Sequence, residues 1–421
     1  MNPSMAGPTT GRAGIAAAAV FMQMCLGIIY AWAVFRTPLE VAYGWSKTES
    51  VAPYRWSIAF FTLAMIVGGF WQDRKGPRLV ASCGGVLLAL GCALASVMGN
   101  TPMGLNVAYG VVAGLGVGFA YVTPIATCVK WFPDKRGMIV GLAVMGFGLG
   151  SLVFAPLLEW LLGKDPALYA STLPATFRML AVVFLICVTG AAQFYRLPPV
   201  NPNAPAASGY TPTEMLRTGA FYLTWLIYFL GSSIGLTAIG EAAPLVRELA
   251  GKTAVMSGGA ALGVMSLFNG GGRLLWGAVS DRQGRKPALI AMAALSAVAC
   301  GLVLPGTSEF WRVLAGLCLV GFCYGGYLAL MPSLTADYFG SRHIGANYGL
   351  LFTAWGMAGF LLPLYSSSVI AAAKRAGDVG GGYNQVFYLL AGLAVGAAAL
   401  AAFTRRPGGA SSGSDRPRRA G

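Results

Sequence analysis

One arginine stands deep inside an apolar segment of the sequence. Arg273 lies in FNGGGRLLWGAVSD, eight residues before Asp281, which corresponds to about 12 Å along a helix axis. An arginine side chain is shorter than that distance, so its charge cannot readily reach water at the helix end. An ionisable side chain at such a depth predicts a functional site. Its planar guanidinium can bind a carboxylate through two hydrogen bonds, whereas the alternative is a structural arginine satisfied by backbone carbonyls or an aromatic ring.

Other polar side chains stand near this arginine or at comparable depth in other apolar segments. Asn269 precedes Arg273 by one helical turn and shares its helix face, where its amide can bind a substrate or orient the guanidinium. Buried tyrosines need partners for their hydroxyl groups. The tyrosines at this depth are Tyr30, Tyr121, Tyr324 and Tyr327, and Gln23 lies on the same face as Tyr30. For each of these residues, ordinary packing is the alternative to a binding role.

The segments that carry these residues are long enough to cross a membrane. Of the 421 residues, 56% are hydrophobic and 10% are charged, against roughly 25% charged residues in a soluble domain. A helix spans a bilayer with about 20 apolar residues. Twelve segments fit, at about 14–35, 52–71, 79–98, 104–129, 137–160, 175–195, 218–240, 256–279, 287–306, 310–334, 346–370 and 384–404. Because only helices satisfy the backbone in hydrocarbon with this pattern, we expect an all-α membrane protein with twelve transmembrane helices.

The loops between these spans differ in charge. The side that holds both termini has 18 basic and 6 acidic residues, and the other side has 10 basic and 8 acidic residues. The positive-inside rule therefore predicts a multi-pass protein of the cytoplasmic (inner) membrane with both termini in the cytoplasm. The basic residues are scattered over short loops, so the net charge of +15 reflects attraction to lipid head groups and does not indicate nucleic-acid binding.

The composition divides the chain into four parts. Residues 1–196 form a first half of six helices, and 218–404 form a second half of six. Between them, 197–217 is a linker with a short amphipathic helix, for which Thr211 is the N-cap, Pro212 the first residue and Glu214 the third residue after the cap. The basic segment 405–421 is predicted to be a disordered cytoplasmic tail.

An internal repeat relates the two halves. GFWQDRKGPR at 69–78 and GAVSDRQGRK at 277–286 share the pattern G-x-x-x-D-R-x-G-x-[RK], 208 residues apart. Each aspartate stands near a helix end, where it can pair with an arginine or cap another helix. Duplicated halves around a central site are typical of secondary transporters. We therefore predict two gating motifs at the inner loops, formed by Asp73, Arg74, Gly76 and Arg78 and by Asp281, Arg282, Gly284 and Arg285.

With these motifs the whole chain resembles the major facilitator superfamily. WFPDKRG at 131–137, EMLRT before span seven and FNGGGR in span eight are similar to the oxalate/formate antiporter and monocarboxylate porter branch. The resemblance implies the major facilitator fold and a central cavity for small organic anions, with Arg273 binding the carboxylate. It also implies a cavity wall of aromatic residues from spans one, four, ten and eleven. Those residues are Tyr30, Tyr121, Tyr324, Phe352 and Tyr327.

Two positions depart from the resembling carriers. Trp355 stands where the oxalate carriers have a lysine, so one cation remains in the predicted cavity. A dicarboxylate would leave one negative charge unmatched there, which costs several kcal/mol. This favours a monocarboxylate such as lactate, pyruvate or formate. Asn269 stands where proton-coupled carriers often have an aspartate, which removes a built-in proton acceptor.

The sequence thus predicts a secondary active transporter of small monocarboxylates that works by alternating access around Arg273. The alternative is an oxalate/formate-type anion exchanger. Both proton symport and exchange with a counter-anion fit, and the lack of an acidic residue deep within the predicted spans favours exchange or a proton carried without a carboxylate. We expect no enzymatic activity, cofactor or metal, because the predicted spans contain no histidine and no acidic residue deep within them, and the eight cysteines show no metal-site spacing. The protein is expected to function as a monomer in the bilayer.

Overall fold

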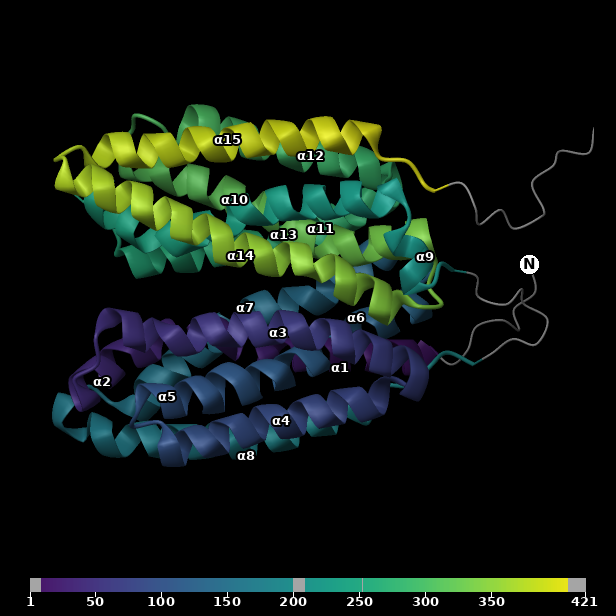
Figure 1. Cartoon of the computed structure of the whole chain (residues 1–421), viewed down its shortest axis with the longest axis horizontal. Coiled ribbons are helices and arrows are strands. Elements are labelled where there is room, and N and C mark those ends of the chain that lie inside the picture. The colour runs from purple at the N-terminus through teal and green to yellow at the C-terminus, as the bar shows by residue number, and fades with distance from the viewer. Residues whose placement is uncertain (1–8, 200–208, 252, 408–421) are drawn as a thin grey trace, which may run out of the picture.

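The computed structural model describes residues 9–199, 209–251 and 253–407, and these residues are helical almost throughout. Most of the predicted linker and most of the predicted basic tail lie outside the described residues. Figure 1 shows the helices in two bundles that lie side by side. The first half contains α1 to α8, and the second half contains α10 to α15. One isolated bridge, between Gly209 and Gly340, is the β pairing found among the described residues.

The helices follow one another with short connections. The first half consists of α1 Thr9–Leu26, η2 Gly27–Ala31, α2 Ala33–Tyr43, α3 Lys47–Lys75, α4 Pro77–Met98, α5 Pro102–Leu105, η3 Asn106–Ala113, α6 Gly114–Trp131, α7 Arg136–Leu162, η4 Pro166–Leu168 and α8 Tyr169–Ala192. The linker contributes α9 Pro212–Leu216. The second half consists of α10 Gly219–Leu249, α11 Gly258–Gln283, α12 Arg285–Val298, η5 Ala299–Val303, α13 Phe310–Phe339, α14 Ile344–Arg375 and α15 Val379–Phe403.

The described part of the chain contains 11 helical stretches that are long and apolar enough to cross a membrane. α11 is the remaining long helix, with 26 residues. It falls short in hydropathy because Asn269, Arg273 and several glycines occupy its centre. The predicted fold class, an all-helical membrane protein of two six-helix halves, is confirmed.

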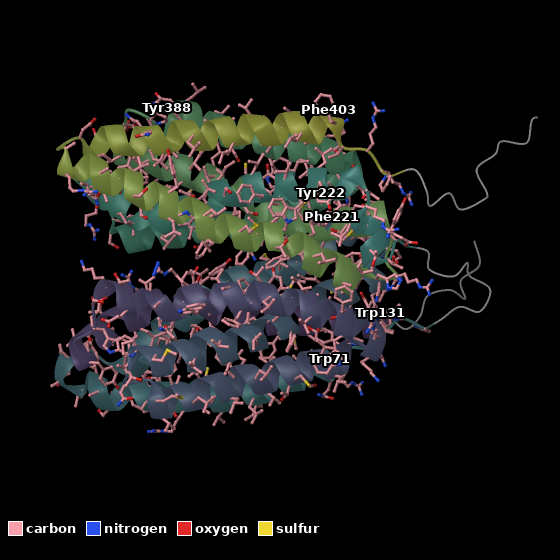
Figure 2. All side chains as sticks on the ribbon, viewed as in Figure 1. Trp71, Trp131, Phe221, Tyr222, Tyr388 and Phe403 are labelled. Carbon is pink, nitrogen blue, oxygen red and sulfur yellow. The ribbon has the colours of Figure 1, made fainter. Side chains whose placement is uncertain are left out.

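Large apolar side chains cover the outside of the bundles, where a soluble protein would be polar. On α15, Tyr388 is 58% exposed and Phe403 is 73% exposed, and Figure 2 shows both on the outer face of that helix. Such a surface is stable in contact with lipid tails, because a bilayer removes the penalty of exposing apolar groups to water.

Several helices run beyond the ends predicted from apolar composition. α10 continues from the predicted end at 240 to Leu249, and α14 continues from 370 to Arg375. The extensions contain charged residues such as Arg247 and Lys374. A helix keeps its backbone hydrogen bonds past the hydrocarbon boundary, whereas an apolar pattern stops at that boundary.

The linker helix is held at one end of the second half, where it contacts α10 and α14. Thr211 and Glu214 form a reciprocal cap, with the Thr211 amide donating to Glu214 Oε2 at 2.7 Å and the Glu214 amide to Thr211 Oγ1 at 3.3 Å. Next to this cap, the Tyr210 amide donates to the Phe339 carbonyl at 2.8 Å, and Asn347 Nδ2 donates to the Tyr210 carbonyl at 3.0 Å. We call this end of the molecule the linker end and the opposite end, where α2 and α5 lie, the far end (Figure 1).

The two halves meet where repeat-related helices cross at glycines. A Cβ atom on Gly69 of α3 would clash with the backbone of Gly345 on α14. In the same way, a Cβ atom on Gly277 of α11 would clash with the backbone of Gly137 on α7. Gly69 and Gly277 are the first residues of the two copies of the repeated motif. The crossings α3–α14 and α7–α11 therefore bring the backbones of the two halves into direct contact.

Candidate functional site

The guanidinium of Arg273 lies at the crossing of α7 and α11, completely buried at 0% exposure. Its Nε donates a hydrogen bond to Asn269 Oδ1 at 3.1 Å, and its Nη1 donates to the carbonyl of Val144 on α7. Its Nη2 has no hydrogen-bond partner among the described residues. Among the residues that the structure describes, Arg273 is also the one acidic or basic residue that is fully buried. An unpaired buried charge is costly, so this donor group is suited to an anionic ligand.

Asn269 fixes the orientation of the arginine. Its Nδ2 donates to the carbonyl of Gly321 on α13 at 3.2 Å, which leaves Oδ1 to accept from Arg273. The backbones of α11 and α13 approach closely here, because a Cβ atom on Gly272 would clash with Phe322 and one on Gly325 with Asn269. Asn269, one helical turn before Arg273, therefore links the guanidinium to α13 and fixes its position.

Glycines of α7 make room for the arginine from the first half. A Cβ atom on Gly141 would clash with the backbone of Arg273, and one on Gly148 would lie 3.4 Å from the guanidinium carbon. A larger side chain at Gly148 would occupy the space beside the charge. The guanidinium thus lies at the interface of the two halves and contacts both.

Aromatic rings from both halves surround the Arg273 guanidinium. Tyr121 of α6 lies 5.0 Å from Phe61 of α3 and 5.1 Å from Phe147 of α7, measured between ring centroids. Phe61 contacts Phe352 of α14 at 5.3 Å, so the contacts cross from one half to the other. We call the connected set the aromatic cluster. Its members are Tyr30, Phe61, Tyr121, Phe147, Tyr228, Tyr348, Phe352 and Trp355.

Trp355 ties the aromatic cluster to a tyrosine beside the arginine. Its ring stacks on Phe352 at 4.8 Å, and its Nε1 donates to the Tyr324 hydroxyl at 2.8 Å. The Tyr324 ring lies where a Cβ atom on Gly235 of α10 would be. Because Tyr324 accepts from the tryptophan, its own O–H group is available as a donor. The Tyr30 hydroxyl lies beside both the Tyr324 hydroxyl and Arg273.

The structure thus brings together most of the residues that the sequence singled out. Asn269, Tyr30, Tyr121, Tyr324, Phe352 and Trp355 all belong to the surroundings of Arg273. Tyr327 lies elsewhere: its ring packs against Gly231 of α10, and its hydroxyl has no hydrogen-bond partner among the described residues. Gln23 lies behind the cluster, where Nε2 donates to the Tyr121 carbonyl at 3.3 Å.

Four members of the aromatic cluster were not identified from the sequence. The repeat offset of 208 residues could have found two of them, since it relates Asn269 to Phe61 and Trp355 to Phe147. Tyr228 and Tyr348 have no such signal. The offset relates them to Val20 and Val140, and an aromatic residue in an apolar span is ordinarily a packing residue.

At the linker end, the second copy of the repeated motif contacts the first half. Both oxygens of Asp281 accept hydrogen bonds from the start of α7, from the Gly137 amide at 2.9 Å and the Met138 amide at 2.8 Å. Arg285 Nη1 lies 2.7 Å from Asp281 Oδ1. A carboxylate at a helix N-terminus is stabilised by the free amides and by the helix dipole. Asp281 therefore attaches α11 to α7.

The first copy of the motif makes the related contact with the second half. Asp73 accepts from the Ala346 amide at the start of α14 at 2.9 Å, and from Lys130 Nζ at 3.2 Å. Asp337 of α13, which the sequence analysis missed, links the halves as well. It pairs with Arg136 at 2.7 Å and with Arg285 at 2.8 Å.

The other motif residues form the turns or face outward. Gly76 and Gly284 have positive φ angles of 88° and 97°, which glycine adopts without strain. Arg74, Arg78 and Arg282 are exposed, and none of the ion pairs found in the described parts of the chain includes them.

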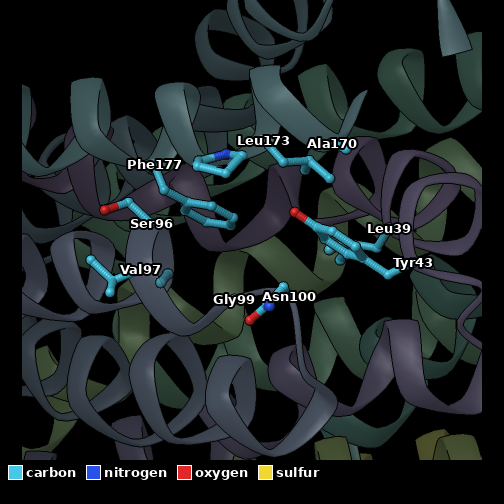
Figure 3. A pocket seen from close by; sticks show the side chains of 11 residues that line it. Leu39, Tyr43, Ser96, Val97, Gly99, Asn100, Ala170, Leu173 and Phe177 are labelled. Atoms are coloured by element: carbon cyan, nitrogen blue, oxygen red, sulfur yellow. The ribbon is translucent and has the colours of Figure 1, made fainter. Parts of the chain in front are cut away.

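A separate cavity of about 290 Å³ opens near the far end. It lies within the first half, between α2, α4 and α8, and Figure 3 shows Tyr43, Ser96, Asn100 and Phe177 around it. None of the residues around Arg273 lines it, so it is distinct from the candidate site.

The described structure is that of a multi-pass membrane transport protein. It has two related halves, a buried cation at their interface and closing contacts at one end. The chain belongs to the Major Facilitator Superfamily, whose sequence model matches residues 13–363 and, in a second match, residues 274–420. The predicted membership is confirmed, and the chain is a transporter and not an enzyme.

Two sequence relatives and one solved structure show which transporters of this superfamily the chain is similar to. Over 364 residues the chain is 30% identical to the oxalate:formate antiporter of Oxalobacter formigenes, which covers 84% of this chain and 85% of that protein. Over 357 residues it is 29% identical to apicoplast pyruvate carrier 1 of Toxoplasma gondii, which covers 70% of this chain and 64% of that protein. The solved structure of the human organic anion transporter MFSD10 matches 94% of this chain and 100% of that chain, with a TM-score of 0.73 and 15% identity, which shows the fold alone.

Proposed function

We propose that the protein is a secondary active transporter of small monocarboxylates, of the lactate, pyruvate or formate type. The observation that carries this proposal is the fully buried Arg273, whose Nη2 has no partner among the described residues. A carboxylate placed against Nη2 pairs the charge through a charge-assisted hydrogen bond. The hydroxyl groups of Tyr30 and Tyr324, which lie beside the guanidinium and beside each other, are suitable donors for the second oxygen.

The surroundings of the arginine favour a single negative charge. Trp355 and Phe352 form an apolar wall, and the indole donor of Trp355 is occupied by Tyr324. A second carboxylate group would have no cation to pair with in this wall, and burying it unpaired costs several kcal/mol. A compact anion with a small apolar remainder fits better.

Transport follows from the position of the site at the crossing of α7 and α11. Substrate binding neutralises the guanidinium, and the two halves then rock so that the site opens to alternate sides. The linker end is held by Asp73, Asp281 and Asp337, so we expect opening at the far end to admit the substrate. Residues 1–196 and 218–404 are the two moving units, joined by the linker 197–217, and one chain suffices.

The charge of the loops supports an orientation in the membrane. The linker end carries the excess of basic residues, so we assign it to the cytoplasm, with both termini on that side of the inner membrane. Residues 405–421 then form a basic cytoplasmic tail.

An oxalate/formate-type exchanger is the second candidate. The relationship to the oxalate:formate antiporter, at 30% identity over most of both chains, favours it. The two candidates differ in the charge of the preferred anion and in the driving force, since exchange requires a counter-anion on the opposite side.

Uptake into proteoliposomes tests both candidates. Labelled lactate, formate and oxalate would be supplied to wild type and to Arg273→Ala, with an inward proton gradient or with unlabelled anion inside. We expect monocarboxylate uptake by wild type, its loss in Arg273→Ala, and normal uptake by Arg178→Ala, which removes an exposed arginine of α8. Uptake that survives Arg273→Ala would assign the arginine a structural role and contradict the proposal.

A further inference from the structure

A carboxylate lies inside α10, well away from Arg273. The predicted span ended at residue 240, but α10 continues to Leu249, so Glu241 is a helical residue. It lies about seven residues from the middle of this 31-residue helix, or about 10 Å along the axis. Glu241 is half-buried, and its helix neighbours Ala242 and Leu245 are buried.

The single hydroxyl hydrogen of Ser366 is shared between two acceptors, one of which is this carboxylate. Ser366 of α14 is 1% exposed, and its Oγ lies 3.1 Å from Glu241 Oε1 and 3.1 Å from the Pro363 carbonyl. A serine has one hydrogen to donate, so it can serve only one of these acceptors at a time. If Glu241 carries a proton, the acid donates to Ser366 and the serine donates to Pro363. Both acceptors are then satisfied, which the ionised form does not allow.

Few charged groups face Glu241. Lys374 on α14 and Glu248 on α10 are the charged groups near it. They are paired with each other, with Lys374 Nζ 2.6 Å from Glu248 Oε1. The Tyr383 hydroxyl of α15 donates to Glu248 Oε2 at 3.1 Å. Arg247, next to Glu248 on α10, has its Nη2 3.9 Å from Glu248 Oε1. The cation that could hold Glu241 ionised is therefore already committed to another carboxylate.

The serine connects this carboxylate to the helix that carries the aromatic wall. Ser366 follows Trp355 by eleven residues, about three turns, so both lie on one face of α14. Pro363 stands between them inside the helix. A proline there removes a backbone hydrogen bond and weakens the helix at that point. The far-end part of α14 can thus move relative to the part that carries Trp355.

We propose that Glu241 and Ser366 form a proton-binding site that controls how α10 holds the far-end part of α14. A proton from water at the far end forms the O–H bond on Glu241, and Ser366 turns its own hydrogen from the carboxylate to the Pro363 carbonyl. The charge-assisted hydrogen bond between the helices becomes a neutral one, which is weaker. Protonation therefore loosens α14 and speeds the change of state.

The test compares uptake by the full chain in proteoliposomes as the external pH is lowered from about 8 to about 5, a range that covers the titration of glutamate in proteins. This arm rests on the proposed carboxylate transport. Wild-type lactate uptake should rise as the pH falls. Glu241→Gln, which is neutral and keeps a donor and an acceptor, should take up lactate at the wild-type acidic rate at every pH. Glu241→Gln with the wild-type pH dependence would overturn the proposal.

Glu40 offers a matched control. Ser50 lies 2.6 Å from Glu40 Oε1 and 3.1 Å from the Lys47 carbonyl, the same pattern of contacts. That pair joins the last turn of α2 to the first turn of α3 within the first half, so it has no contact with α14. Glu40→Gln should therefore keep the wild-type pH dependence, and loss of that dependence in this variant would overturn the assignment to Glu241.

A spectroscopic arm is independent of transport. Infrared difference spectra between the two pH values should contain the carbonyl stretch of a protonated carboxylic acid in wild type and in Glu40→Gln. The intensity should be lower in Glu241→Gln. Equal intensity in all three proteins would overturn the proton site. If no protein transports a carboxylate but this band is lost in Glu241→Gln, the proton site stands and the proposed substrate is wrong.

Discussion

At the scale of single residues, Trp355 orders the side chains around Arg273. The side chain of Trp355 stacks on Phe352 and donates to Tyr324, so it holds a hydroxyl in place beside the arginine. A lysine at this position would instead put a second positive charge within the wall. The identity of residue 355 is therefore expected to set the charge of the preferred substrate.

Trp355→Lys should shift the preference from monocarboxylates to oxalate. The new ammonium can pair with the second carboxylate group of oxalate. A gain of about 1.4 kcal/mol in binding free energy corresponds to a tenfold change in affinity. We expect the ratio of oxalate to lactate uptake to rise at least about tenfold. Trp355→Phe, which removes the indole donor without adding charge, should leave that ratio low. Equal oxalate uptake by wild type and Trp355→Lys would contradict this role.

The two tyrosines that the sequence could not tell apart should behave differently. Tyr30→Phe removes a hydroxyl beside Arg273 and should raise the substrate concentration for half-maximal uptake about fivefold, since one hydrogen bond contributes about 1 kcal/mol. Tyr327→Phe removes a hydroxyl that has no partner in the described structure and should leave that concentration unchanged. Saturation curves for lactate uptake measure both effects, and an equal effect of the two substitutions would be inconsistent with the geometry.

At the scale of helices, glycines decide how closely the halves approach. Gly277→Ala should lower the thermal stability, because its Cβ atom meets the Gly137 backbone and overpacking costs about 1–3 kcal/mol. Gly271→Ala, on the same helix, has nothing within 4 Å of the added atom and should be neutral or slightly stabilising. Melting temperatures in detergent would measure both. A Gly277→Ala protein as stable as wild type would mean that α7 and α11 do not touch in solution.

The sequence predicted the helices and the Arg273–Asn269 pair because both depend on local spacing. It did not predict Phe61 or Tyr348 in the aromatic cluster, or Asp337 at the linker end. These residues meet their partners through helix crossings between segments that are far apart in the chain. It also placed the end of α10 before Glu241, since an apolar pattern marks the hydrocarbon boundary and a helix can continue past it.

At the scale of the whole molecule, the repeat produces two related attachments at the linker end. Asp73 binds the start of α14, and Asp281 binds the start of α7. Each aspartate lies on one half and its amide partners lie on the other. Rocking of the halves toward a state open at the linker end must therefore break both attachments together, and each contributes separately to the balance between the two states.

Asp73→Asn and Asp281→Asn should each shift this balance toward the state open at the linker end. A charge-assisted hydrogen bond to a helix N-terminus contributes about 1–2 kcal/mol, so each substitution should raise the open population about 5- to 30-fold. The attachments involve different helices, so the double variant should shift the balance by roughly the sum of the two free energies. The rate at which a maleimide labels a cysteine introduced at Ala336, which is buried on α13, measures the open population.

Arg282→Ala is the control for this experiment, because Arg282 belongs to the same motif but is exposed and outside the described ion pairs. It should label at the wild-type rate. If either aspartate variant alone labels as fast as the double variant, the two attachments act as one unit and the halves separate in a single step. If neither variant labels faster than wild type, the contacts of Asp73 and Asp281 hold the turns in place and do not set the balance between the two states.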